Sequence, residues 1–228
     1  MTRSDQKDVT QPHLRALIFD MDGVLVFSEP LLAEASMKIF ADRGYTVDRA
    51  DFKPFTGMGE ARFMGGVAER HGIPFDPVAD KELLYQVFLE MMPGRLAPLP
   101  GVPDFILECK KKGLKVALAS SADDVKVYPI LKQIGIDPSE FDAIVTGSMV
   151  AHKKPAPDVF LEAVRRLGVP ASNCLVVEDA VAGIEAALAA GCRALGLTTA
   201  FAGEVLLAAG ADWVAHDLTG VPDEALAW

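Results

Sequence analysis

The amino-acid sequence predicts an α/β fold, with a doubly wound parallel sheet and an inserted all-helical cap. From residue 103 onward, short apolar runs alternate with helical segments, which is the order of elements in parallel sheets with crossover helices. The first apolar run ends directly in Asp20 and Asp22, and such sheets bind ligands beyond the carboxyl ends of their strands. Residues 27–97 show helical patterns instead. We therefore expect a core of residues 1–26 and 98–228 and a helical cap of residues 27–97.

In chain order, the first strand is the apolar run Ala16–Phe19, which ends at the aspartates because aspartate is a poor strand former. A helix is expected from Leu31 to Arg43, since apolar residues recur there at helical spacing and Gly44 follows. A loop over residues 51–59 leads to helices at 60–70 and 79–91, after which prolines and glycines break the chain. The remaining helices are expected at 103–112, 125–134, 156–167, 181–190 and 204–209, and the remaining strands at 114–119, 143–146, 174–177, 194–197 and 213–215.

The composition is that of an acidic globular protein. In 228 residues, 32 Asp and Glu outnumber 22 Lys and Arg, so the net charge is -10. Such a charge repels nucleic acid and anionic membranes. No apolar run is long enough to span a membrane, and residues 1–12 do not resemble a signal peptide. We expect a monomer that acts without nucleic acid or membrane in the cytoplasm, or in the chloroplast stroma if the source is photosynthetic.

Chemically reactive side chains follow three of the expected strands. In chain order, these side chains are Asp20 and Asp22, Ser120 and Ser121, and Glu178 and Asp179. Lys154 precedes the expected helix at 156–167. Because parallel strands end at the same edge of a sheet, we expect all these side chains to converge there.

This set of residues suits the hydrolysis of a phosphate ester. Asp20 can attack phosphorus and form an aspartyl phosphate, while Asp22 can protonate the leaving oxygen and later activate water. Magnesium prefers oxygen ligands, and Asp20, the backbone carbonyl of Asp22, and Asp179 can supply three of them. Glu178 is then expected to hold these ligands in place without binding the metal itself.

Two kinds of group can hold the phosphate. Ser120 and a following backbone N–H can bind the phosphoryl oxygens, and Lys154 can neutralise their charge in the transition state. Taken alone, Ser120 or Ser121 could cap a helix, and Lys154 could be a surface charge. The order of these residues at successive strand ends favours the catalytic interpretation.

Four motifs of the chain resemble those of the haloacid dehalogenase superfamily: FDMDGVL, ASSA, KKPAPDVF and VVEDAVAGIEAA. The resemblance extends over the chain from Leu14, and it implies a Rossmann-like core with a helical cap that closes over the site and selects the substrate. It implies the nucleophile Asp20, the acid and base Asp22, phosphate contacts from Ser120, Ser121 and Lys154, and Mg²⁺ ligands at Asp20, Asp22 and Asp179. Within the superfamily, the chain is similar to the branch of beta-phosphoglucomutases and CbbY-like sugar-phosphate phosphatases.

Departures from the mutase pattern favour hydrolysis. The mutases have a cap histidine where this chain has Leu32, a phosphate-binding cap arginine near Glu60, and an asparagine at Asp124. A mutase must hold a doubly phosphorylated intermediate, which an acidic residue in place of that arginine opposes. Arg62 could take the place of the arginine, so a phosphosugar mutase is the alternative function.

Two stretches, DFKPFTGMGEARFMGGVA and CKKKGLKVALASSADDVKV, resemble a phosphatase-like domain of a larger regulatory protein of chloroplasts. This resemblance makes a regulatory domain with little turnover a second alternative.

The cap is expected to swing about residues 26–30 and 96–100. The cap residues expected to select the substrate are Phe55, Thr56, Gly57, Met58, Gly59, Glu60 and Arg62. Cap packing is the other interpretation for Phe55 and Met58, and loop shape or close helix packing for the glycines. The sequence thus predicts a Mg²⁺-dependent phosphatase of a small phosphorylated metabolite, such as a sugar phosphate, that works through an aspartyl phosphate.

Overall fold

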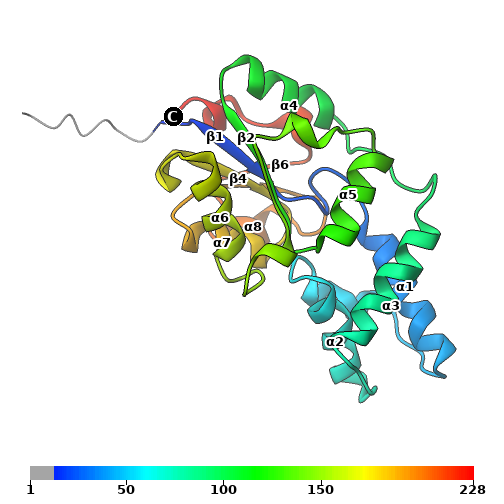
Figure 1. The fold of residues 1–228 in the computed structure, drawn as a ribbon. Coiled ribbons are helices and arrows are strands. Elements are labelled where there is room, and N and C mark those ends of the chain that lie inside the picture. The colour runs from blue at the N-terminus through cyan, green and yellow to red at the C-terminus, as the bar shows by residue number, and fades with distance from the viewer. Residues whose placement is uncertain (1–12) are drawn as a thin grey trace, which may run out of the picture.

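A computed structural model describes residues 13–228 and contains a six-stranded sheet (Figure 1). The strands are β1 (Ala16–Phe19), β2 (Lys115–Ala119), β3 (Ala143–Val145), β4 (Cys174–Glu178), β5 (Arg193–Leu197) and β6 (Trp213–Ala215). Neighbouring strands are parallel, in the order β3-β2-β1-β4-β5-β6. The predicted doubly wound α/β fold is confirmed. The prediction about a signal peptide concerns residues 1–12, which lie outside the described residues.

Alternating side chains of the strands build an apolar layer on each face of the sheet. Leu17 and Phe19 of β1 belong to the layer that includes α4 (Val102–Lys111) and α5 (Asp124–Gln133). Ala16 and Ile18 belong to the opposite layer, with α6 (Asp158–Leu167), α7 (Val181–Ala189) and α8 (Gly203–Ala208). Figure 1 shows α4 on one side of the sheet and α6, α7 and α8 on the other. All of β1 is buried, as expected for a strand that is covered on both faces.

The chain between residues 27 and 97 forms four helical elements that pack on one another. They are α1 (Glu29–Asp42), the 3₁₀ helix η1 (Arg49–Phe55), α2 (Glu60–His71) and α3 (Ala79–Met91). In Figure 1, α1, α2 and α3 lie at the lower right, beyond one end of the sheet. The chain crosses between the two parts at Val26 and Pro98, which form an antiparallel bridge. The division into core and cap at residues 27 and 97 stays a prediction.

The expected loop over residues 51–59 is wrong in its first half, where η1 forms. Asp48 and Asp51 make a reciprocal capping box, in which the Asp48 N–H donates to Asp51 Oδ2 at 2.9 Å. Phe52 and Phe55 of this helix are buried. The capping box and these two apolar contacts stabilise a helical turn that contains Pro54.

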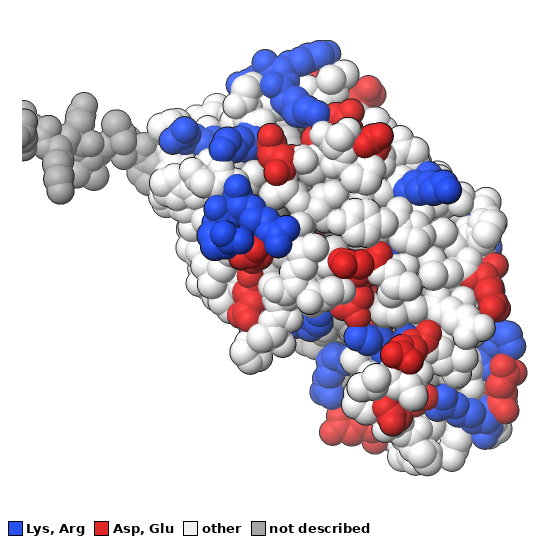
Figure 2. Space-filling view, in the orientation of Figure 1, with Lys and Arg blue, Asp and Glu red and all other residues white. Residues whose placement is uncertain are grey.

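Short 3₁₀ helices make several other connections: η2 (Pro138–Glu140), η3 (Gly147–Met149), η4 (Ala171–Asn173), η5 (Leu218–Gly220) and η6 (Asp223–Leu226). Within the described part of the chain, no helix has both the length and the apolar character that crossing a membrane requires. Figure 2 shows Lys and Arg side chains in small groups, with Asp and Glu side chains beside them. Arg165 and Arg166, for example, both pair with Glu162 at 2.7 Å.

Candidate active site

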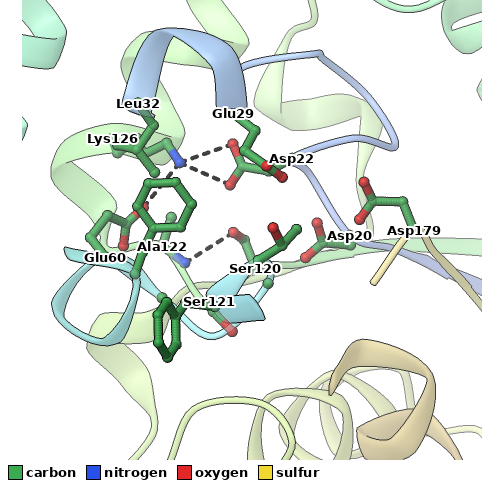
Figure 3. A pocket seen from close by; sticks show the side chains of 15 residues that line it. Asp20, Asp22, Glu29, Leu32, Glu60, Ser120, Ser121, Ala122, Lys126 and Asp179 are labelled. Atoms are coloured by element: carbon green, nitrogen blue, oxygen red, sulfur yellow. Dashed lines mark hydrogen bonds and ion pairs between the residues drawn. The ribbon is translucent and has the colours of Figure 1, made fainter. Parts of the chain in front are cut away.

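Six of the predicted site residues lie at the carboxyl edge of the sheet. Asp20 follows β1, Ser120 and Ser121 follow β2, β4 ends in Glu178 with Asp179 next, and Lys154 precedes α6. Figure 3 shows that the carboxyl groups of Asp20 and Asp179 lie close together, next to Ser120. The strand ends therefore bring together residues that lie far apart in the sequence.

The Lys154 ammonium lies among the carboxylates. Its Nζ donates to Asp20 Oδ1, to Glu178 Oε1 at 2.6 Å and to the carbonyl of Ala119 at 3.2 Å. These contacts use all three donors of an ammonium. Burial lowers the pKa of Lys154, but the Asp20 and Glu178 carboxylates outweigh burial and raise it, so the group stays charged. Because the side chain is 0% exposed, the alternative of a surface charge is excluded.

This buried cluster has an excess of negative charge. Asp20, Glu178 and Asp179 each place an oxygen within 4.8 Å of the others. With the Lys154 ammonium, three ionised carboxylates leave two negative charges. Burial raises the pKa of Asp20 to about 7; Lys154 opposes this effect, and Glu178 and Asp22 add to it. Burial also raises the pKa of Asp179 well above its ordinary value.

The excess charge makes the cluster a fitting site for a divalent cation. Two positive charges would balance the two uncompensated carboxylates, and Mg²⁺ prefers carboxylate and carbonyl oxygens. Glu178 is already occupied, because its Oε2 accepts the N–H groups of Asp179 at 2.9 Å and Ala180 at 3.1 Å while its Oε1 faces Lys154. Asp20 and Asp179 are therefore the better candidates for direct metal ligands.

Two glycines allow the acidic side chains to approach so closely. A Cβ at Gly183 of α7 would overlap the carboxyl group of Glu178. A Cβ at Gly23 would overlap the carboxyl group of Asp179, and Gly23 also has a φ of +76°. The glycine after the first acidic motif and the glycine inside α7 thus make room for the cluster.

Ser120 and Ser121 line the cavity above this cluster. Ser120 Oγ accepts a hydrogen bond from the Ala122 N–H at 3.1 Å. Ser121 Oγ is buried and has no hydrogen-bond partner in the part of the chain that the structure describes. The residue at the N-cap of α5 is Asp123, so the alternative that either serine caps this helix is excluded. A buried hydroxyl without a partner is available to a bound anion.

A cavity of about 40 Å³ lies between the strand ends and the cap (Figure 3). The cap side of its wall consists of Glu29, Leu32, Phe55, Thr56, Gly57, Gly59, Glu60 and Phe63. Met58 and Arg62, which the sequence also predicts as substrate-selecting residues, instead line an adjoining hollow with Lys153 and Lys154. The cavity wall opposite Asp20 is thus largely apolar, with carboxylates at Glu29 and Glu60.

Gly57 and Gly59 place the cap loop against the core. Their φ angles are +79° and +83°, which favour glycine. A Cβ at Gly57 would lie 2.8 Å from Ala180 Cβ, and one at Gly59 would lie 3.3 Å from the carbonyl oxygen of Ser121. These contacts support the interpretation that the two glycines serve loop shape and close packing.

Lys126 of α5 is a site residue that the sequence analysis missed. Its Nζ lies 2.9 Å from Asp22 and 3.0 Å from Glu60 Oε1, and its side chain is 1% exposed. Burial lowers the pKa of Lys126, but the Asp22 and Glu60 carboxylates outweigh burial and raise it. Ser28 Oγ also donates to Asp22, which points toward Lys126 in Figure 3. Asp22 is therefore held at the cavity wall by two donors.

The three departures from the mutase pattern have different places in the structure. Leu32 and Glu60 both lie in the cavity wall. Asp124 instead accepts a hydrogen bond from Thr146 Oγ1, at the start of α5. Arg62 is half exposed and pairs with Glu69 at 3.0 Å, and its guanidinium lies 5.0 Å from the centre of the Phe55 ring. In this structure, then, Arg62 does not take the place of a phosphate-binding arginine inside the cavity.

An α/β core with paired aspartates after the first strand, a buried lysine and an acidic pair after β4 defines a class of hydrolases. The family model of haloacid dehalogenase-like hydrolases matches residues 14–191, and the chain belongs to this family. The resemblance inferred from the four motifs is confirmed, and so is the prediction that the chain is a hydrolytic enzyme of this family.

Comparison with individual proteins gives narrower similarities than the family model. The chain is 44% identical over 209 residues to Protein SUPPRESSOR OF QUENCHING 1, chloroplastic, of Arabidopsis thaliana; the match covers 90% of this chain but 20% of that protein. It is 33% identical over 209 residues to the Phosphorylated carbohydrates phosphatase of Thermotoga maritima, with 87% and 92% covered. Among solved structures, a mutant of CbbY from Rhodobacter sphaeroides in complex with xylulose-(1,5)bisphosphate has a TM-score of 0.83 and 29% identity, with 94% of this chain and 100% of that chain covered. Phosphatases of phosphate monoesters are thus among the relatives, while the roles of single residues stay predictions.

Proposed function

We propose that this chain is a Mg²⁺-dependent phosphatase that hydrolyses a small phosphorylated metabolite, such as a sugar phosphate, through an aspartyl phosphate at Asp20. One observation carries the proposal: Asp20 lies in the cavity between a buried ammonium and an acidic partner, Asp179. The cavity of about 40 Å³ is smaller than such a substrate, so the cap would have to move to admit it. The carbohydrate phosphatase relative supports the same reaction class.

The proposed reaction has two displacements at phosphorus. In the first, an oxygen of Asp20 forms a bond to phosphorus while the bond from phosphorus to the ester oxygen breaks, and Asp22 gives a proton to the departing oxygen. In the second, Asp22 takes a proton from water, the water oxygen bonds to phosphorus, and the bond to Asp20 breaks. Inorganic phosphate leaves, and both aspartates return to their starting states.

The proposed ligands of Mg²⁺ are Asp20, Asp179 and the backbone carbonyl of Asp22. When bound, the ion neutralises negative charge on the transferring phosphoryl group. Glu178 supports this arrangement because it anchors Lys154 at 2.6 Å and accepts two backbone N–H groups at the end of β4.

Ser120, Ser121 and Lys154 are the proposed phosphate contacts. The unpartnered hydroxyl of Ser121 can donate to a phosphoryl oxygen, and Ser120 lies next to it in the cavity wall. Lys154 already contacts the Asp20 carboxylate, so its charge lies beside the atom that attacks phosphorus.

The cap segment Gly57, Met58, Gly59, Glu60 and Arg62 is proposed to select the substrate, and of its side chains Glu60 faces the cavity. Cap movement about residues 26–30 and 96–100 would admit substrate and water in turn. We further propose that the protein acts as a monomer, without nucleic acid or membrane, in the cytoplasm or the chloroplast stroma.

Two alternatives to the phosphatase function can be tested by experiment. A phosphosugar mutase would need a second cationic group for the distal phosphate, and Arg62 is engaged with Glu69 outside the cavity. A regulatory domain with little turnover is suggested by the relative from Arabidopsis thaliana, of which this chain matches 20%. The complete set of acidic, hydroxyl and ammonium groups favours a catalytic role over the regulatory domain.

The test is release of inorganic phosphate from hexose, pentose, glycerol and glycolate phosphates and from nucleotides, in Mg²⁺ or in EDTA. The Asp20→Asn variant is the blank, and Asp42→Asn, an exposed aspartate in an ion pair of α1, is the matched control. Release that needs Mg²⁺ and Asp20 but not Asp42 would support the proposal. Conversion to an isomer that depends on a sugar bisphosphate would favour the mutase, and no release above the blank would favour the regulatory domain.

A further inference from the structure

The two ends of the cavity would bind different parts of the substrate. Beneath the floor, the buried Lys154 ammonium and the proposed metal site would attract the phosphate. Toward the cap, Asp22, Glu29 and Glu60 face the space left for the rest of the substrate. Among the described residues that line the cavity, Lys126 alone has a cationic side chain, and it is shared between two carboxylates. The leaving-group end thus has no uncompensated positive charge.

Glu60 nevertheless offers a hydrogen-bond acceptor that Lys126 holds in place. A lysine ammonium has three N–H donors, and Lys126 Nζ lies 2.9 Å from each carboxylate oxygen of Asp22 and 3.0 Å from Glu60 Oε1. The remaining lone pairs of the Glu60 carboxylate are available to a group in the cavity. In Figure 3 the two side chains lie on the side of the cavity opposite Asp20 and Asp179.

Glu60 is fixed in this position by the cap and the core together. Glu60 Oε2 accepts the hydroxyl of Tyr85 at 2.8 Å, and the same hydroxyl oxygen accepts the N–H of Asp123 at 3.1 Å. Lys81 of α3 also pairs with Asp123 at 2.6 Å. Because Glu60 is 4% exposed and held by a buried network, its charge cannot turn away to solvent when an anion enters.

We propose that Glu60, held in place by Lys126, is a specificity-determining residue that accepts an uncharged, hydroxyl-bearing leaving group and rejects one that carries a second phosphate or a carboxylate. The Glu60 carboxylate accepts a hydrogen bond from a hydroxyl of the leaving group. An anionic group at this end meets Glu60 and Glu29, while Lys126, the cation in the described wall of this cavity, is already paired with carboxylates. This inference rests on the proposed function for its phosphate end, and it separates this chain from the CbbY relative that holds a bisphosphate.

The experiment measures binding without turnover. Dissociation constants are determined calorimetrically with the Asp20→Asn variant in Mg²⁺, for glycerol phosphate against phosphoglycerate and for sorbitol 6-phosphate against 6-phosphogluconate. Each pair differs only by a hydroxymethyl group against a carboxylate. The expected preference for the uncharged member is roughly tenfold or more, from like-charge repulsion across a few ångströms of buried cavity.

Adding Glu60→Gln to this variant tests the residue itself. We expect the preference to shrink by about tenfold, through tighter binding of the carboxylate members. The matched control is Glu34→Gln, which removes a cap charge that pairs with Arg95 on the exposed surface, and it should leave the preference unchanged. Glu60→Gln in the otherwise native chain should change KM for the carboxylate members more than kcat, and Glu34→Gln should change neither.

The outcomes are distinct. Equal or tighter binding of the carboxylate members, a preference that Glu60→Gln leaves unchanged, or no binding of either uncharged ester would each overturn the inference. If the uncharged esters bind with the expected preference but the native chain hydrolyses no ester, the proposed function fails while the selectivity stands.

Discussion

Replacing Lys154 by methionine removes the ammonium from the buried cluster and keeps most of the side chain's apolar volume. Three carboxylates, Asp20, Glu178 and Asp179, would then share one site without a positive charge. Removing one partner of a buried ion pair costs about 3–5 kcal/mol, and in a chain of this size each kcal/mol lowers Tm by about 2–4 °C. We therefore expect Lys154→Met to lower Tm at pH 8 by roughly 10 °C.

The pH dependence of this loss identifies its cause. Burial already raises the pKa of Asp20 to about 7, and Lys154 is the group that opposes this shift. Without Lys154, protonation of the cluster relieves the repulsion, so the gap in Tm between the variant and the native chain should shrink as the pH falls from 8 to 5.

The assay is thermal unfolding in EDTA, followed by circular dichroism at both pH values. Lys38→Met is the matched control, because Lys38 and Asp42 are more than half exposed and such pairs contribute about 0–1 kcal/mol. A Lys154→Met variant that melts within 2–3 °C of the native chain, or one whose deficit is the same at pH 5 and pH 8, would refute the reasoning about buried charge.

Two further predictions concern the same cluster. Because burial raises the pKa of Asp20 from 3.8 to about 7, its proton contributes stability that is complete below pH 3.8 and lost as the pH rises through about 7. Mg²⁺ competes with that proton, so the rise in Tm that Mg²⁺ produces should be larger at pH 8 than at pH 6. An equal rise in Tm at both pH values would contradict this competition. Gly183→Ala should destabilise the chain by about 1–3 kcal/mol, although alanine usually stabilises a helix, because its Cβ would overlap Glu178. Gly203→Ala, whose Cβ would lie 3.5 Å from Val214, is the control, and urea unfolding of both variants is the measurement.

Much of the fold could be predicted because its strands are short apolar runs followed by polar residues. Ala16–Phe19 is bounded as expected, and the parallel order follows from the helices between strands. The gathering of Asp20, Ser120 and Glu178 was predictable for the same reason, since parallel strands end at one edge. The 3₁₀ helix at Arg49–Phe55 was missed because a proline and two aspartates are typical of a loop, whereas here the aspartates cap the helix, Pro54 lies inside it, and Phe52 and Phe55 are buried.

The place of Lys126 in the site could not be predicted from the sequence. In a helix with other charged residues, a lysine ordinarily lies in solvent, and nothing in its immediate neighbours indicates two carboxylate partners. One signal was present: Lys126 precedes buried Ile130 by four positions and therefore lies on the apolar face of α5. Its partners, Asp22 and Glu60, are 104 and 66 residues away in the chain, so their convergence depends on how cap and core meet.

The most direct test of the account is detection of the phosphoryl group on Asp20. The Asp22→Asn variant, mixed with p-nitrophenyl phosphate and Mg²⁺, should form the adduct, because p-nitrophenolate leaves without a proton, and should then hydrolyse it slowly for lack of the base. We predict a burst of one p-nitrophenolate per chain and, after acid quenching, a mass increase of about 80 Da on the peptide that contains Asp20. Steady release without a burst, and no adduct on that peptide while the native chain turns over, would contradict the aspartyl-phosphate mechanism.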